Sequence, residues 1–226
     1  MSTSGRSVTP PRRQPVYEGA LNSELIVDAA LAIVRESGLA ALTMRRLATD
    51  LRTAPMTVYR HVDDRRALLL LMLDVVADGV KLDPVSGDPR TDVTAAITAI
   101  HDALQADSWA VELLVTDKLA SPKILPSIER IFAGFTAAGL APEDVAAAYS
   151  LVWHYTVGEI MDRHHAPADA YSRAMVDAAD PASYPSLTSV VSQLRGRPPL
   201  APYSANLSRL LDGLLGEPSP HDACRE

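Results

Sequence analysis

Leu42–Leu73, LTMRRLATDLRTAPMTVYRHVDDRRALLLLML, is the stretch that decides the fold of this chain. Thr43 is placed to cap a helix, and the apolar side of that helix is formed by Leu47, Ala48 and Leu51. The next four residues, RTAP, interrupt the pattern. Pro55 suits the first turn of a new helix because its missing N–H costs nothing there.

This second helix is expected to be short and polar, with about two turns and an end near His61-Val62. A third helix, starting at Asp63 or Asp64 and running to about Val80, is almost wholly aliphatic. A helix–turn–helix with a short, polar second helix fits the major groove of DNA.

Residues 22–79 resemble the DNA-binding domain of the TetR family of one-component transcriptional regulators. The matching residues keep the family's spacing: Gly38-Leu39, Leu42-Thr43-Met44-Arg45, Leu47-Ala48, Leu51, Val58-Tyr59-Arg60-His61-Val62, Arg65 and Leu68-Leu69. In two places the chain departs from the family. The turn normally carries Gly then Val, where this chain has Arg52 and Thr53, and the usual polar cap of the recognition helix is Ala54. An alanine cap forfeits about 1 kcal/mol of helix stabilisation.

The resemblance also implies which residues contact DNA. Tyr59 and His61 match the family's phosphate-binding pair, and Thr43 and Arg65 match its two helix-start phosphate contacts. Arg45 is placed to reach a base edge or a phosphate. The full predicted set is Thr43, Arg45, Pro55, Met56, Thr57, Tyr59, Arg60, His61 and Arg65, with Pro55, Met56 and Thr57 facing the bases.

For some of these side chains a structural role remains open. Tyr59 is alternatively a half-core residue with a solvated hydroxyl, and Arg46 and Arg66 fit a solvated helix face better than a DNA contact. The basic N-terminal arm, residues 1–18, contains Arg6, Arg12 and Arg13 and is expected to be disordered. It either reaches DNA or only solubilises the chain.

Composition indicates an all-α protein with two domains. The chain has 226 residues, 47% of them hydrophobic and 5% aromatic, and lacks alternating β-branched runs. The single cysteine, Cys224, excludes an intrachain disulfide. No apolar run reaches the roughly 18 residues of a membrane span, and the N-terminus has no signal-peptide core, so a cytoplasmic location without membrane contact is expected.

Charge is distributed unevenly. Residues 1–66 hold ten Lys and Arg against seven Asp and Glu, a net charge of +3, and the remainder carries −10. This asymmetry is expected when only the N-terminal end meets phosphate. We therefore expect a helix–turn–helix domain over residues 19–66, connected through helix 63–80, a helical effector-binding and dimerisation domain over 67–216, and a disordered tail over 217–226.

The second domain is expected to contain helices at Thr91–Ala106, Trp109–Thr116, Pro122–Ala138, Pro142–His165 and Tyr203–Leu215, after a linker at Leu82–Arg90. Between residues 166 and 200 the pattern is weak and favours one or two short helices. Pro126–Ile128, Leu140, Pro142–Asp144 and Gly158 extend the TetR resemblance loosely into this half.

Two helices of this domain, Val145–Gly158 and Tyr203–Leu215, suggest a dimer. Val145–Gly158 is apolar nearly all round, and a helix without a wet face must be buried on both sides. The alternative for either helix alone is intramolecular core, but an operator-binding protein of this kind also needs a dimer to span half-sites roughly 34 Å apart. The predicted interface residues are Val145, Tyr149, Val152, Leu207, Leu210, Leu211 and Leu214.

Polar and aromatic side chains suggest where a small apolar effector binds. They are His101, Trp109, Trp153, His154 and Tyr155, with plain core packing as the alternative for Trp153. No catalytic motif is found and no cofactor is implied. No metal site is expected either, since Glu159, Asp162 and the adjacent His164-His165 do not converge on one ion.

The sequence therefore predicts a homodimeric transcriptional repressor that binds a palindromic operator in double-stranded DNA and is released by an unidentified small molecule. A ligand- or partner-binding module with a vestigial DNA head and a helical enzyme are the competing hypotheses.

Overall fold

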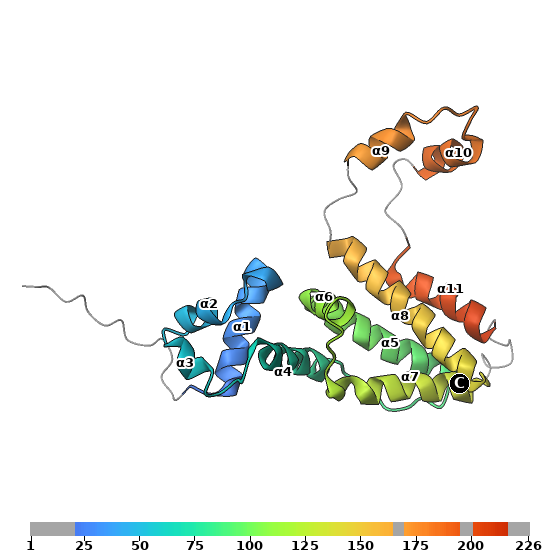
Figure 1. Ribbon diagram of the computed structural model, residues 1–226. Helices are drawn as coiled ribbons and strands as arrows, with labels where there is room; N and C mark the ends of the chain where they lie inside the picture. Colours follow the sequence, from blue (N-terminus) through green and yellow to red (C-terminus); the bar gives the residue numbers. More distant parts are fainter. Residues whose placement is uncertain (1–20, 165–169, 195–200, 217–226) are drawn as a thin grey trace, which may run out of the picture. The chain divides into compact units, whose positions relative to one another are not determined.

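The computed structural model describes residues 21–164, 170–194 and 201–216 of the chain, and every regular element within them is a helix (Figure 1). This confirms the predicted all-α class. By their contacts the residues divide into two compact units, one of Met1–Gly79 with Glu112–Lys123, the other of Val80–Val111 with Ile124–Glu226. The predicted boundary between the helix–turn–helix domain, residues 19–66, and the effector-binding domain, residues 67–216, stays a prediction. The N-terminal arm with its three arginines, the C-terminal tail and His165 lie outside the described residues.

The first unit contains α1 (Ser23–Ser37), η1 (Leu39–Ala41), α2 (Met44–Asp50), α3 (Pro55–Val58) and α4 (Arg65–Asp78). Three of its helices begin at side-chain caps: Asn22, Thr43 and Asp64 accept hydrogen bonds from the backbone N–H groups of the third residue after each. Such caps satisfy donors that the first turn leaves free. The core beneath α2 and α3 is formed by Ile26, Ala30, Leu47, Val58, Leu68 and Met72.

The recognition helix is shorter than predicted. The α-helical part of α3 ends at Val58, not near His61-Val62. Beyond it the chain tightens, because Arg60 N–H donates to Thr57 O at 3.3 Å and His61 N–H to Val58 O at 3.0 Å, three residues back. The expectation of two α-helical turns was therefore wrong, although the chain keeps turning as far as Val62.

The second unit is built around α5 (Pro89–Ala106), α7 (Leu125–Ala137), α8 (Pro142–His164) and α11 (Tyr203–Leu215), which pack on one another (Figure 1). The most extensive packing is between α5 and α7, where Gly134 lets the backbone of α7 approach Val93 of α5. α6 (Trp109–Val115) and η2 (Pro122–Ile124) lie between α5 and α7 in sequence. α9 (Ala170–Asp177) and α10 (Pro185–Leu194) form a pair in the region where one or two short helices were expected.

Candidate nucleic-acid interface and effector region

Nearly all of the predicted DNA-contacting side chains are on the exposed surface of α2, of α3 with the turn after it, and of the start of α4. Exposed are Thr43, Arg45, Pro55, Met56, Tyr59, Arg60, His61 and Arg65, while Thr57 is partly buried. Met56 is 70% exposed and Tyr59 is 42% exposed. This exposure of Tyr59 fits both a phosphate contact and the half-core alternative, so its role stays a prediction. Beneath this surface Val58 and Leu47 are fully buried, so the two helices have a fixed base.

Neighbouring arginines of α2 have different surroundings. Arg46 lies 4.0 Å from the carboxylate of Glu36 and 3.7 Å from that of Asp50, and its guanidinium donates to the Ser37 hydroxyl. Arg45 is exposed, and its backbone carbonyl accepts a hydrogen bond from Thr49. The placement of Arg46 agrees with the solvated helix face expected from the sequence.

The turn between α2 and α3 has an unusual backbone. Arg52 adopts φ +52°, a left-handed conformation, directly after the end of α2 at Leu51. Its N–H donates to Thr49 O at 3.0 Å, and Thr53 N–H donates to Ala48 O at 2.9 Å. These two bonds define a Schellman motif, which usually carries glycine at the left-handed position. Sequence reasoning noted the missing glycine here but not that its conformation is retained.

A polar and aromatic cluster, defined by His101, Tyr155, Thr156, Glu159 and Tyr203, lies between α5, α8 and α11. His101 is buried, with its ring nitrogens 2.9 Å from Asp102 Oδ1 and 3.1 Å from Glu159 Oε2. The imidazole stacks on Tyr203 at a centroid distance of 3.7 Å, and Tyr155 stacks parallel to Tyr203 at 5.4 Å. Three rings from three helices are thus aligned.

The hydroxyl groups of this cluster are bonded unequally. Thr156 donates to Val152 O, so the 2.7 Å contact between Thr156 and Tyr203 is a bond donated by Tyr203. Burial raises the pKa of the Tyr203 hydroxyl well above its usual range, which keeps it protonated for that role. The buried Tyr155 hydroxyl has no hydrogen-bond partner among the described residues. A buried polar group without a partner costs about 1–3 kcal/mol.

The predicted effector residues do not all converge on this cluster. His101 and Tyr155 belong to it, whereas His154 is exposed on α8, with its Nδ1 3.4 Å from the Ser150 hydroxyl. Trp109 is buried and donates to Asp107 at 2.9 Å, as a satisfied core residue does, and Trp153 is half-buried. Tyr203 and Glu159 were missed, because nothing in the local sequence around them indicates that they meet His101.

The predicted dimer residues also fall into two groups. Val145, Val152, Leu207 and Leu211 are buried within a single chain, so they offer little area to a partner. Tyr149, Leu210 and Leu214 remain half-exposed. A further outward stripe on α8, spaced by three and four residues, was not identified from the sequence: Ala147, Leu151, His154, Gly158 and Met161.

The last turns of α4 are tied to the segment 112–123 in the first unit. Ser121 donates to Asp74 at 2.5 Å, and the Lys123 ammonium donates to Asp78, also at 2.5 Å. The Asp78 carboxylate raises the pKa of Lys123 above its ordinary value. Asp74 and Asp78 are one helical turn apart, so this α4 clamp, defined by the two aspartates with Ser121 and Lys123, holds one face of the helix.

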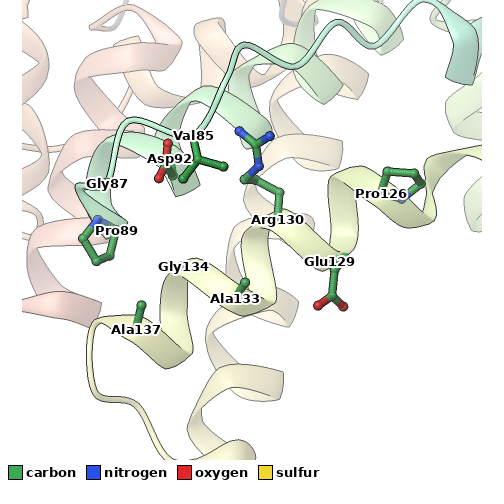
Figure 2. A pocket seen from close by; sticks show the side chains of 10 residues that line it. All are labelled: Val85, Gly87, Pro89, Asp92, Pro126, Glu129, Arg130, Ala133, Gly134 and Ala137. Atoms are coloured by element: carbon green, nitrogen blue, oxygen red, sulfur yellow. The ribbon is translucent and has the colours of Figure 1, made fainter.

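A hollow of about 350 Å³ lies between α7 and the segment that precedes and opens α5 (Figure 2). Its polar groups are largely bonded within the protein: Arg130 reaches up to donate to Asp83 O at 2.8 Å, and Asp92 accepts from Ser86 N–H at 2.8 Å. None of the predicted effector residues lines this hollow.

Within the described residues, no group of three or more His, Cys, Asp or Glu side chains is arranged to bind a metal ion. In the same part of the chain, no helix is long and apolar enough to cross a membrane.

Family models match both halves of the chain. Residues 26–72 match the model described as bacterial regulatory proteins, tetR family, and residues 83–216 match the tetracyclin repressor-like C-terminal domain. An HTH-type transcriptional regulator from Saccharopolyspora erythraea is 34% identical over 152 residues, which are 66% of this chain and 64% of that protein. The match thus spans less than two thirds of that relative. The HTH-type transcriptional repressor DrrR1 from Streptomyces coeruleorubidus is 26% identical over 219 residues, 90% of this chain and 80% of the relative.

Solved structures share the fold. Apo ActR from Streptomyces coelicolor has a TM-score of 0.71 at 24% identity, covering 88% of this chain and 98% of ActR. BioQ in complex with its double-stranded DNA operator has a TM-score of 0.61 at 23% identity, covering 87% of this chain and 99% of BioQ. With a helix–turn–helix, a helical second unit and family models matching each, this chain belongs to the TetR family of bacterial transcriptional regulators.

Proposed function

We propose that this chain is a ligand-responsive transcriptional repressor that binds a near-palindromic operator as a homodimer. The observation that carries the proposal is the exposed polar surface of α2 and α3 over a fully buried base. Two relatives support it: DrrR1 is named a repressor, and BioQ has been solved on its operator. Such a protein acts in the cytoplasm by binding, not by catalysis.

On DNA the surface divides into base-reading and phosphate-binding parts. Met56 is exposed at the leading end of α3, where its methyl group suits a thymine methyl in the major groove. Arg45 at the start of α2 supplies a guanidinium for a guanine edge or a phosphate. Tyr59 and His61 supply phosphate contacts, which fix the register of the protein on the duplex.

Dimerisation would use the outward faces of α8 and α11. Leu151 on α8 is 52% exposed, and Met161 lies on the same stripe. Leu210 and Leu214 give α11 a half-exposed face one turn apart. Four helices, two from each subunit, would bury these side chains, and the resulting two-fold axis would place the recognition helices on successive half-sites.

The effector is proposed to bind beside the polar and aromatic cluster. The buried Tyr155 hydroxyl has a hydrogen bond to offer, and the aligned rings of His101, Tyr155 and Tyr203 suit a flat ligand. ActR has been solved in complex with actinorhodin and with (S)-DNPA, and other relatives are tetracycline repressors. A ligand that binds the DNA-free conformation more tightly would release the operator.

The α4 clamp offers a route for this release. Segment 112–123 packs with α4 in the first unit, yet it is continuous in sequence with α5 and α7 of the second unit. A ligand-induced change in α5 or α7 would therefore pull on Asp74 and Asp78 through Ser121 and Lys123.

DNA binding is tested by mobility shift with DNA flanking the protein's own gene, over a series of salt concentrations. The wild-type shift should weaken steeply with salt, because each phosphate contact releases counterions. Arg45→Ala and Tyr59→Phe should both weaken it. Arg46→Ala is the matched control, because it removes the same charge from the adjacent position, where the side chain is held by Glu36 and Asp50.

A folded protein that gives no specific shift with that DNA, nor with any fragment in a genome-wide selection, would contradict the proposal. The absence of a specific shift would favour a ligand-binding module whose helix–turn–helix is vestigial. Induction is tested separately with a panel of aromatic compounds. A compound that leaves the operator affinity unchanged at a saturating concentration is not an inducer. For a compound that does release the operator, Tyr155→Phe should weaken its binding to the protein.

A further inference from the structure

The helix–turn–helix keeps an energetically costly residue at its turn. Arg52 and Lys118 are the non-glycine residues with positive φ in the described part of the chain, each at +52°. The left-handed conformation places Cβ close to the following carbonyl oxygen and costs a residue with a side chain roughly 1 kcal/mol relative to glycine.

Nothing in the backbone of the turn requires an arginine. The α2 helix ends in a Schellman motif with Arg52 at its left-handed position. The chain builds the same motif at the end of α7, where Gly139 N–H donates to Thr136 O at 2.9 Å and Leu140 N–H to Phe135 O at 3.2 Å. There the left-handed residue is glycine, with φ +96°. Glycine would therefore form the turn after α2 at lower cost.

What arginine adds is an exposed, permanently charged guanidinium at the junction of α2 and α3. Arg52 precedes Pro55, the first residue of α3, by three positions, and its side chain is exposed. A guanidinium binds phosphate oxygens through two parallel N–H groups. Non-glycine residues held in the left-handed region concentrate at functional sites, where the contact they make compensates for the strain.

The charge distribution makes this guanidinium important for DNA binding. Residues 1–66 carry a net charge of only +3, and Arg46 already faces the carboxylates of Glu36 and Asp50. A segment with so small a net positive charge gains substantially from each phosphate contact.

We propose that Arg52 is a further DNA-binding residue, which contacts a backbone phosphate beside the recognition helix and is retained there in spite of its backbone strain. The inference rests on the proposed DNA-binding function. Because a phosphate contact carries no sequence information, its loss should weaken binding to specific and non-specific DNA alike.

The test combines thermal unfolding with DNA binding over a salt series, using the full-length protein and the operator identified for the wild type. Arg52→Asn removes the charge but suits the left-handed backbone, because asparagine visits that region more readily than arginine. It should unfold at the wild-type temperature or higher, yet bind DNA several-fold more weakly, with a salt slope lower by about 1. Arg52→Lys should retain most of the affinity.

Lys118→Asn is the matched control, because it removes a positive charge at the same φ in the same unit, outside the helix–turn–helix. It should leave the operator affinity unchanged. Wild-type affinity and salt slope in Arg52→Asn would overturn the proposal, as would an equal loss in Lys118→Asn. A lower unfolding temperature with unchanged affinity would assign Arg52 to the stability of the head. If the wild type itself binds no DNA, the proposed function fails and this inference fails with it.

Discussion

The turn after α2 and the turn after α7 have the same pair of backbone hydrogen bonds but different residues at the left-handed position. One carries Arg52 in the DNA-binding unit, and the other carries Gly139 in the second unit. Local backbone chemistry favours glycine in both. Gly139 is the residue that the backbone conformation favours, whereas we propose that Arg52 is retained for a contact with DNA.

Gly134, in contrast to Gly139, is a glycine required for space and not for backbone conformation. A Cβ at this position would lie 2.4 Å from Val93 Cγ2 and 3.2 Å from Pro89 O. Both atoms belong to α5, and Val93 is fully buried, so neither yields easily. We expect Gly134→Ala to lower the free energy of unfolding by about 2–3 kcal/mol, measured by urea denaturation.

The matched control is Gly213→Ala in α11, where a Cβ would meet nothing within 4 Å. It should be neutral or slightly stabilising, since alanine is the better helix former. Equal effects at the two positions would mean that α5 and α7 do not pack as closely as described.

Exchanging the turn residues tests the comparison directly. Gly139→Arg should lower the free energy of unfolding by about 1 kcal/mol, because a Cβ there would meet nothing within 4 Å but the backbone conformation opposes any side chain. Arg52→Gly should raise that free energy by about the same amount.

Gly139→Asn distinguishes the cost of the backbone conformation from that of side-chain crowding. Asparagine tolerates the left-handed region better than arginine and should be less costly. A lower free energy of unfolding in Gly139→Arg together with a higher one in Arg52→Gly supports the comparison. Destabilisation by Arg52→Gly would instead show that the arginine stabilises the folded helix–turn–helix.

The smallest expected effect is at Ala54, which caps α3 without a side-chain hydrogen bond. Ala54→Ser should raise the free energy of unfolding by about 0.5–1 kcal/mol by supplying the acceptor that Thr43 supplies to α2. Thr43→Ala should lower it by a similar amount. No gain from Ala54→Ser would indicate that the tight end of α3 leaves the new hydroxyl no N–H in reach.

Sequence patterns predicted the parts of the fold that depend on neighbouring residues. The cap at Thr43 and the start of α3 at Pro55 lie where expected, and α4 begins at Arg65, next to the predicted start at Asp63 or Asp64, because each depends on groups within one turn of chain. The predicted end of α3 was wrong, because the tightening of the backbone at Arg60 and His61 has no residue signature comparable to a proline or a glycine.

The polar and aromatic cluster was only partly accessible from the sequence. His101 and Tyr155 stood out as polar and aromatic residues in apolar helices. Their neighbours Glu159 and Tyr203 did not, because the contacts of His101 with these two residues join positions 58 and 102 apart. The relative register of α5, α8 and α11 decides such contacts, and that register is a result of packing the whole unit.

The grouping of segment 112–123 with α4 has a consequence for synthesis of the chain. A nascent chain released as far as Gly79 already contains the helix–turn–helix but not Ser121 and Lys123, the partners of Asp74 and Asp78. Because domains fold as they leave the ribosome, the DNA-binding head emerges first but acquires its last partners only after α5 has been translated. The head is thus completed late by residues that lie between α5 and α7, and a fragment ending at Gly79 would lack them.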